Sequence, residues 1–351
     1  MRTHVCMACR PFPAMRDIFQ RSRRWIALTL WLAGSAVCHA AAPRAELAPD
    51  VQAFVLEMVE RHGFERAPLE RALRGTKFLD SIVRAMDAPS TALPWHEFRA
   101  RYITDAHIDG GLRFWAEHAA VLERATAEYR VPPEIIVATI GIETIFGRRT
   151  GNVNVLDALT TLAFGYPRRA VFFRGELEQF LLLARETGWG FNTVRGSFAG
   201  AIGIPQFLPS SYRKYAVDFD GDGSRDLRRV ADAVGSVANY YRQFGWQEGA
   251  PVIVPVDVGD TALDAMLAAG IAPHMPAAEF RKRGVVPLEP VADDVAAALI
   301  MAETDSGPRY WLGLNNFYVI TRYNRSINYA MVVNELATAL RRQRGGAVAV
   351  R

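Results

Sequence analysis

The sequence predicts a mainly α-helical (α+β) protein with a small β-containing insertion. From Val51 to about Arg130, apolar residues recur at spacings of three and four, which is the period of an amphipathic helix. In residues 131–147 the apolar side chains fall on every face of a helical wheel, as they do in a buried helix. After Gly249, β-branched residues gather in 252–258 and 285–288, which indicates strands.

These patterns divide the chain into consecutive ranges. We expect a signal peptide (1–40), a linker (41–50), an N-terminal helical domain (51–130), a core (131–249), a β-containing domain (250–305), a return to the core (306–345) and a tail (346–351). Helices are expected over 155–164, 170–185, 210–217, 231–244 and 328–342, whereas 298–301 fits either a strand or a helix.

The first forty residues resemble a secretory signal. Three arginines precede the apolar run 25–37, and the small residue Ala40 offers a cleavage site. The run is too short to span a bilayer comfortably, so we expect export to the periplasm with no membrane span left after cleavage. A retained anchor is the alternative, as is an outer-membrane lipid anchor at Cys38, although Val37 precedes it and the usual Leu is missing. Met15 is an alternative start.

Removing residues 1–40 changes the charge and cysteine content. They hold six of the 41 basic residues and one of the 37 acidic residues, so the rest carries 35 basic and 36 acidic residues. The overall charge of +4 therefore gives no argument for nucleic acid as a partner. All three cysteines lie in this segment, so the remainder needs neither a disulfide nor a thiol nucleophile.

Glu143 is the candidate catalytic residue. It lies near the end of 131–147, a range that two prolines can open and a glycine can close. Burial raises the pKa of a carboxyl group, and a carboxyl that stays protonated at neutral pH can act as a general acid. The alternative is a structural glutamate paired with Arg148 or Arg149.

An acidic glycine loop is the candidate metal site. Asp218, Asp220 and Asp222 occupy alternate positions and a glycine follows, as in the first half of an EF-hand calcium loop. The second half departs, because Arg229 stands where a bidentate glutamate is expected and Asp232 follows three residues later. Clustered carboxylates repel one another without a cation, so we expect a structural calcium site of modest affinity. The alternative is a plain Asp/Gly turn.

Polar and aromatic residues near predicted helix ends form a second set of candidates. Aromatic faces with neighbouring amide and hydroxyl groups suit sugar rings, although each such residue alone is more often structural. The set is Ser197, Gln206, Tyr240, Tyr241, Tyr323, Asn324 and Tyr329. The sequence has no Walker-type phosphate loop, no His-Glu-x-x-His motif and no Gly-x-Ser-x-Gly elbow.

Several long motifs follow the order found in one enzyme family. Residues 141–147 (GIETIFG) resemble the catalytic-glutamate motif of the membrane-bound lytic murein transglycosylase B family, which comprises lysozyme-like peptidoglycan lytic transglycosylases of the SLT type. Residues 197–215 (SFAGAIGIPQFLPSSYRKY) resemble its glycine-rich segment, and 315–329 (NNFYVITRYNRSINY) its closing motif. The acidic loop lies between them in the same order, so the resemblance covers about residues 50–345.

The resemblance implies a goose-lysozyme-like catalytic core, and a monomeric enzyme that cleaves the β-1,4 MurNAc–GlcNAc bond of peptidoglycan glycan strands. Glu143 would be the sole catalytic acid, with no cofactor for catalysis. The residues implied to contact substrate are Ser197, Gln206, Tyr240, Tyr323, Asn324 and Tyr329. Those implied to bind structural Ca²⁺ are Asp218, Asp220, Asp222, Ser224 (through its carbonyl) and Asp232.

One well-placed carboxylate suits lytic rather than hydrolytic chemistry. Glycosidases normally use two carboxylates, whereas an intramolecular attack by the MurNAc C6 hydroxyl needs only an acid that later serves as the base. The expected product end is 1,6-anhydroMurNAc. Two alternatives stay open: a lysozyme-type muramidase that uses water, and a catalytically silent peptidoglycan-binding protein.

Overall fold

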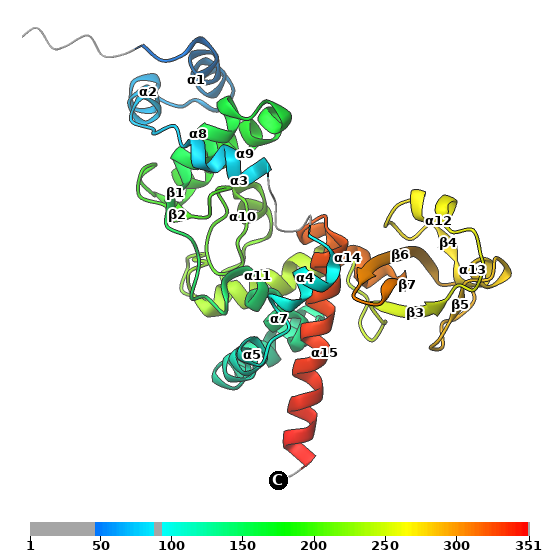
Figure 1. Cartoon of the computed structure of the whole chain (residues 1–351). Helices are drawn as coiled ribbons and strands as arrows, with labels where there is room; N and C mark the ends of the chain where they lie inside the picture. The colour runs from blue at the N-terminus through cyan, green and yellow to red at the C-terminus, as the bar shows by residue number, and fades with distance from the viewer. Residues whose placement is uncertain (1–45, 88–92, 350–351) are drawn as a thin grey trace, which may run out of the picture. The chain divides into compact units, whose positions relative to one another are not determined.

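The computed structural model describes residues 46–87 and 93–349, which lie in one compact unit, Ala45–Arg351. The expected signal peptide, Cys38 and the first half of the expected linker (41–45) lie outside the described residues. Helices dominate the described chain and its strands form two small sheets, which confirms the predicted mainly α class (Figure 1). No helix in these ranges is long and apolar enough to cross a bilayer.

The first three helices belong with a pair of later helices. They are α1 (Pro49–His62), α2 (Arg66–Arg74) and α3 (Asp80–Asp87). α3 packs on α8 (Val155–Gly165), which pairs with α9 (Ala170–Thr187). The Phe54 ring meets the Phe164 ring edge-on at 5.9 Å, and His62 Nε2 lies 2.7 Å from Glu178 Oε1. α1 begins inside the expected linker, because Pro49 provides its start.

The next three helices pack elsewhere. α4 (Trp95–Ala100), α5 (Asp105–Glu117) and α6 (Ala119–Tyr129) contact helices of the core. The range 51–130, expected as one N-terminal domain, is therefore shared between two groups of helices. Helical periodicity shows which face of a helix is buried but not which partner buries it.

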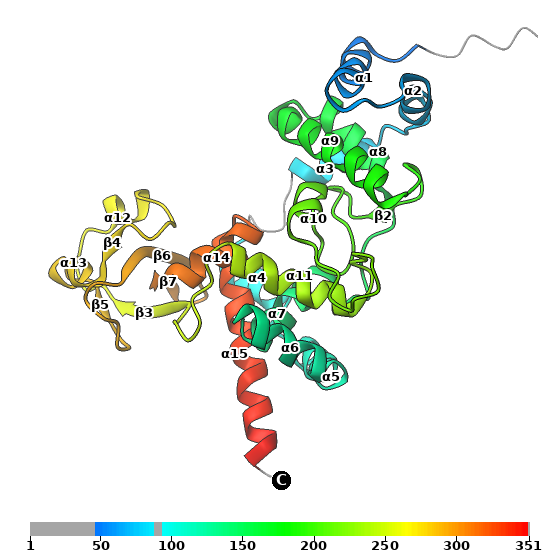
Figure 2. The same ribbon diagram turned by 180° about the vertical axis from the view of Figure 1, so that it is seen from behind.

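The core helices include α7 (Pro133–Thr144), α10 (Pro209–Tyr215), α11 (Val230–Gln243), α14 (Asn315–Tyr323) and α15 (Ile327–Ala349). α7 packs against α15, α11, α5 and α6, as both views show (Figures 1 and 2). α15 continues past residue 345, where a tail was expected. A two-residue ladder of β1 (Val153–Asn154) and β2 (Arg195–Gly196) was not predicted, since two residues are too few to show a pattern.

The β-containing region forms one antiparallel sheet in the order β4-β6-β7-β3-β5. Its strands are β3 (Ile253–Asp257), β4 (Met275–Pro276), β5 (Val286–Pro287), β6 (Ala296–Thr304) and β7 (Gly307–Gly313), with the short helices α12 (Asp264–Ala268) and α13 (Ala277–Lys282). The expected end at residue 305 is wrong, because β7 pairs with both β6 and β3. The first half of β7 is largely exposed and lacks β-branched residues, so its sequence did not read as a strand.

The buried apolar side chains of the described chain form two hydrophobic core clusters. The larger one runs through the helices, and the smaller one lies in the sheet region around Val254, Phe280, Leu299 and Leu312. Segments distant in sequence meet at the carboxyl end of α7: the glycine-rich segment 197–207 and the start of α15.

Candidate active site

Glu143 lies in the last turn of α7. Every residue from Ile135 to Ile142 is buried, so the helix is enclosed on all sides, as its sequence predicted. Glu143 itself is only partly buried. The helix therefore presents this carboxyl at its end, where a ligand can approach it.

Tyr329, in the first turn of α15, is the hydrogen-bond partner of Glu143. Its hydroxyl donates to Glu143 Oε1 at 2.6 Å, and the tyrosine is only 3% exposed. Burial raises the pKa of Glu143 to about 7, and the hydrogen bond from Tyr329 opposes this rise by favouring the carboxylate. Burial also raises the pKa of Tyr329 well above its usual value, so Tyr329 remains a neutral donor. A carboxyl with a pKa near 7 can both donate and accept a proton at neutral pH.

The alternative partners, Arg148 and Arg149, make other contacts. The side-chain Nε of Arg148 donates to the Ile145 carbonyl at 3.2 Å. The backbone N–H of Arg149 donates to the Thr144 carbonyl at 2.8 Å. Within the described chain, burial and Tyr329 are the influences on the pKa of Glu143, and neither arginine is among them. The structural ion pair considered from the sequence is therefore not formed.

The backbone directly after α7 is strained. Ile145, Phe146 and Gly147 have φ angles of 51°, 59° and 82°. The first two lie in the left-handed region that side chains disfavour, at a cost of about 1–3 kcal/mol each. Thr144 Oγ1 holds the turn, because it donates to the Ile204 carbonyl at 2.9 Å and accepts the Gly147 N–H at 3.0 Å. The contacts of Thr144 therefore hold the turn after Glu143 in a backbone conformation that its residues would otherwise disfavour.

Gly141 allows this turn to close on the helix. A Cβ at this position would lie 2.6 Å from Phe146 Cε1, so only glycine lets the ring rest against α7. The Phe146 ring also packs on Phe114 of α5, with centroids 5.8 Å apart. The turn that follows Glu143 is thus fixed from both sides.

Tyrosines from separate helices converge behind Tyr329. Tyr323 stacks on Tyr329 with ring planes 14° apart, and Tyr240 meets Tyr323 edge-on at 4.9 Å. The Tyr323 hydroxyl donates to the Pro205 carbonyl, and the Tyr240 hydroxyl donates to the Arg322 carbonyl at 2.6 Å. Tyr240 is only 6% exposed, so most of its ring supports Tyr323 rather than facing solvent.

The other candidates lie along the glycine-rich segment and at the end of α14. Ser197 Oγ accepts the N–H groups of Ala199 and Ala201 at 3.2 and 3.0 Å, which leaves its proton available for donation. Gln206 has a φ of 53°, and its Nε2 donates to the Thr150 and Gly203 carbonyls. Asn324 directly follows α14 and is partly exposed.

The sequence reasoning missed two threonines that organise the site. Thr144 fixes the strained turn, and Thr139, one helical turn before Glu143, accepts a hydrogen bond from the Tyr241 hydroxyl at 2.8 Å while donating to the Ile135 carbonyl. Both are fully buried. A buried polar residue on an otherwise apolar helix was the available signal, since such groups require partners.

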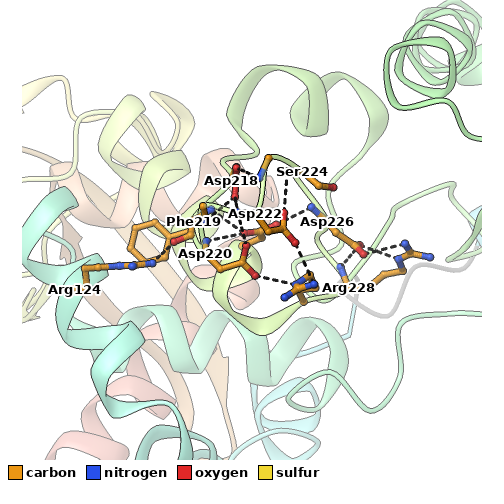
Figure 3. A network of polar contacts seen from close by, with 12 residues as sticks. Arg124, Asp218, Phe219, Asp220, Asp222, Ser224, Asp226 and Arg228 are labelled. Carbon is orange, nitrogen blue, oxygen red and sulfur yellow. Dashed lines mark hydrogen bonds and ion pairs between the residues drawn. The ribbon is translucent and has the colours of Figure 1, made fainter.

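The acidic loop brings its three leading carboxylates together. Oxygens of Asp218, Asp220 and Asp222 lie within 4.8 Å of one another. Asp218 accepts the N–H groups of Gly221, Asp222 and Gly223, which folds the loop around it (Figure 3). This set of carboxylate oxygens fits a hard cation such as Ca²⁺.

Arg229 occupies the same carboxylates in this structure. Its Nε lies 2.8 Å from Asp220 and its Nη1 lies 3.1 Å from Asp222. A metal ion and this guanidinium would compete for the same oxygens. More than half of the Arg229 side chain is exposed, so solvent can take the place of its two carboxylate partners.

Asp232 has a different environment from the other loop acids. It is fully buried at the start of α11, where it accepts the N–H groups of Phe219, Asp220 and Asp226. It ties both ends of the loop to the helix. Coordination by Asp232 and by the Ser224 carbonyl stays a prediction.

Comparison with known proteins gives consistent matches. Residues 46–338 match the family model described as the transglycosylase SLT domain. The chain is 43% identical over 310 residues to membrane-bound lytic murein transglycosylase B of Escherichia coli K12, covering 83% of this chain and 82% of that protein.

Solved structures match along a similar length. The catenated lytic transglycosylase SltB1 from Pseudomonas aeruginosa is 46% identical with a TM-score of 0.79, and the match covers 85% of this chain and 99% of that one. The Escherichia coli lytic transglycosylase Slt35 in complex with calcium is 43% identical with a TM-score of 0.77, covering 84% and 94%.

Proposed function

The chain belongs to the transglycosylase SLT domain family and is a lytic transglycosylase that acts on peptidoglycan, and from this premise we propose that Glu143 is its catalytic acid and base. The proposed reaction cleaves the β-1,4 MurNAc–GlcNAc bond and leaves a 1,6-anhydroMurNAc end. The observation that carries the proposal is the carboxyl of Glu143, with a pKa of about 7, at the open end of a buried helix.

In the first step, protonated Glu143 donates its proton to the glycosidic oxygen. The bond from that oxygen to C1 of MurNAc breaks, and positive charge develops at C1. The Glu143 carboxylate then takes the proton of the C6 hydroxyl while the C6 oxygen bonds to C1. The attached hydroxyl has a large effective-concentration advantage over water, so no second carboxylate is required.

Tyr329 has a positioning role in this scheme. Its hydroxyl keeps Glu143 in one orientation and stabilises the carboxylate that forms after the first step. We expect Ser197, Gln206, Tyr240, Tyr323 and Asn324 to contact the saccharide. Ser197 keeps its hydroxyl proton and Gln206 keeps its side-chain oxygen for that purpose, and Tyr240 would in addition support the Tyr323 ring.

The test is Glu143→Gln on purified sacculi, with products analysed by mass spectrometry. We expect wild-type protein to release anhydromuropeptides and Glu143→Gln to release almost none while keeping its fold. The matched control is Glu176→Gln, because burial also raises the pKa of Glu176 but both its oxygens accept hydrogen bonds from Ser210. An active Glu143→Gln would refute the role. Products one water heavier would favour the muramidase, and no release by wild-type protein would favour a silent binder.

We further propose a structural Ca²⁺ bound by Asp218, Asp220 and Asp222, together with the Ser224 carbonyl and Asp232. The close carboxylates support it, as does a relative of 43% identity whose structure is described as a complex with calcium. Bound calcium would neutralise the loop beside α11 and would take no part in catalysis. Added Ca²⁺ should raise the melting temperature and a chelator should reverse the rise, whereas no response to either would count against the site.

The localisation follows from the N-terminal segment. We propose that residues 1–40 direct export and that the mature enzyme works as a monomer in the periplasm, where peptidoglycan lies. Sequencing the N-terminus of the mature protein would test this. A mature N-terminus near Ala41 would support signal cleavage. A lipid-modified Cys38 would instead support the outer-membrane anchor, which would agree with the name of the Escherichia coli relative, a membrane-bound transglycosylase.

A further inference from the structure

A groove runs along the outer side of α15, away from Glu143. It comprises two adjoining hollows of about 630 and 510 Å³, which share the lining residues Ile253, Trp311, Asn334, Thr338 and Arg342. α4 and the β6–β7 hairpin border the first hollow, and the segment between α11 and β3 borders the second. We call it the α15 groove; its helices and strands are labelled in Figure 1.

Helix geometry separates this groove from the candidate active site. Successive residues of an α-helix are rotated by about 100°, so Asn334, Thr338 and Arg342 form one stripe four residues apart. Tyr329 and the fully buried Leu336 lie on the side of α15 that packs into the core. The body of α15 therefore stands between the groove and Glu143.

Several polar groups in the groove lack protein partners. In the ranges that the structure covers, neither Arg309 nor Arg342 has an ion-pair partner. The nearby carboxylate of Glu335 is already paired, because Arg99 Nε donates to its Oε1 and Oε2 at 2.8 and 2.9 Å. The indole Nε1 of Trp246 and the Nδ1 of His96 are buried without a hydrogen-bond partner within the same ranges. Trp246 is only 3% exposed and lines the second hollow. Both nitrogens are shielded from solvent, so the exposed Arg309 and Arg342 are the groups without an ion-pair partner that a ligand in the groove can reach.

The charge around the groove favours an anionic ligand. Glu134 faces Arg341 at 3.8 Å and Asp305 lies 3.9 Å from His96, so most of its acids already have a cation nearby. Glu289, which lines the second hollow, is the exception within the described residues. The two uncommitted guanidinium groups can each receive a carboxylate in the forked geometry that arginine provides.

A peptide fits this lining better than a neutral glycan. The rings of Trp95 and Trp246 are 6% and 3% exposed, so Trp311 alone offers a face on which a sugar could stack. The Asn334 amide, which lines both hollows, can both donate to and accept from peptide groups. Because the enzyme acts on peptidoglycan, whose strands carry acidic peptide stems, we propose that the α15 groove binds such an acidic stem peptide at a site separate from Glu143.

Binding of two soluble probes to the full chain tests this proposal. One is the acidic tripeptide L-Ala–D-Glu–diaminopimelate, and the other is the same peptide with its carboxylates amidated. We expect wild-type protein to bind the acidic form about tenfold more tightly, measured by calorimetry and by tryptophan fluorescence. The double variant Arg309→Gln/Arg342→Gln should lose this preference. Asn334→Asp should weaken binding of the acidic form by adding a negative charge to the groove floor.

The matched control is Arg71→Gln, which removes the same charge from the exposed face of α2. It should bind the acidic peptide as wild-type protein does. All variants should cleave peptide-free glycan strands at the wild-type rate, whereas the groove variants should show a raised KM on intact sacculi. Unchanged peptide binding in both groove variants would overturn the proposal, and so would equal binding of the amidated peptide or of peptide-free glycan. Failure of the catalytic assignment would appear instead as an active Glu143→Gln.

Discussion

Replacing Tyr329 by Phe should move the alkaline limit of activity to higher pH. The Tyr329 hydroxyl donates to Glu143 at 2.6 Å, and this bond favours the ionised carboxylate. A hydrogen bond to a charged group is worth about 1.5–3 kcal/mol, and about 1.4 kcal/mol corresponds to one pKa unit. Burial persists in the variant because the ring remains. The pKa of Glu143, about 7 in the native protein, should therefore rise by about one to two units.

The direction of the shift in the alkaline limit follows from the role of Glu143 as a general acid. A general acid works only while protonated, so activity falls as the pH rises through its pKa. The assay is kcat/KM for release of soluble muropeptides from sacculi between pH 5 and about 9. The maximal rate should fall as well, because Phe no longer stabilises the carboxylate formed in the first step. An alkaline limit that stays in place, or that moves to lower pH, would refute the proposed coupling between Tyr329 and Glu143.

Three further predictions concern stability and metal binding. Because the pKa of Glu143 rises from an ordinary 4.5 to about 7 on folding, the protein should lose up to about 3 kcal/mol as the pH rises through this window. Glu143→Gln should therefore be the more stable protein at pH 8 but not at pH 4, as urea unfolding will show. Gly141→Ala should lower stability and activity, because its Cβ would lie 2.6 Å from Phe146. The control is Gly175→Ala, where no atom lies within 4 Å of the added Cβ, and it should stabilise α9 by about 0.5–1 kcal/mol. Arg229→Gln should enlarge the calcium-induced rise in melting temperature, and an unchanged rise would show that this side chain does not compete for the carboxylates.

The local features of the chain could be predicted from its sequence. The buried helix α7 follows from a largely apolar run between prolines and a glycine, and the structure confirms it over Pro133–Thr144. The clustering of Asp218, Asp220 and Asp222 follows from their alternate spacing. In both cases the residues that define the feature are close neighbours in the chain.

The long-range partnerships could not be predicted in the same way. Tyr329 was expected to contact a saccharide, yet it is 3% exposed and its hydroxyl is engaged by Glu143. These residues are 186 positions apart, and no local pattern encodes such a contact. Asp232 is predicted as a calcium ligand from its spacing, and this stays a prediction, but no local pattern shows that its oxygens also accept three backbone N–H groups. A residue type gives its chemistry, but its partner depends on packing.

The contact between α15 and Glu143 has a consequence for the synthesis of the enzyme. The residue that orients the carboxyl belongs to the last helix of the chain, so a polypeptide released before residue 329 contains the complete α7 but not the hydroxyl that holds its carboxyl. Fragments ending earlier would also lack the helix that covers one side of α7. If Glu143 acts as proposed, we therefore expect fragments that end before residue 329 to cut peptidoglycan more slowly than the complete chain.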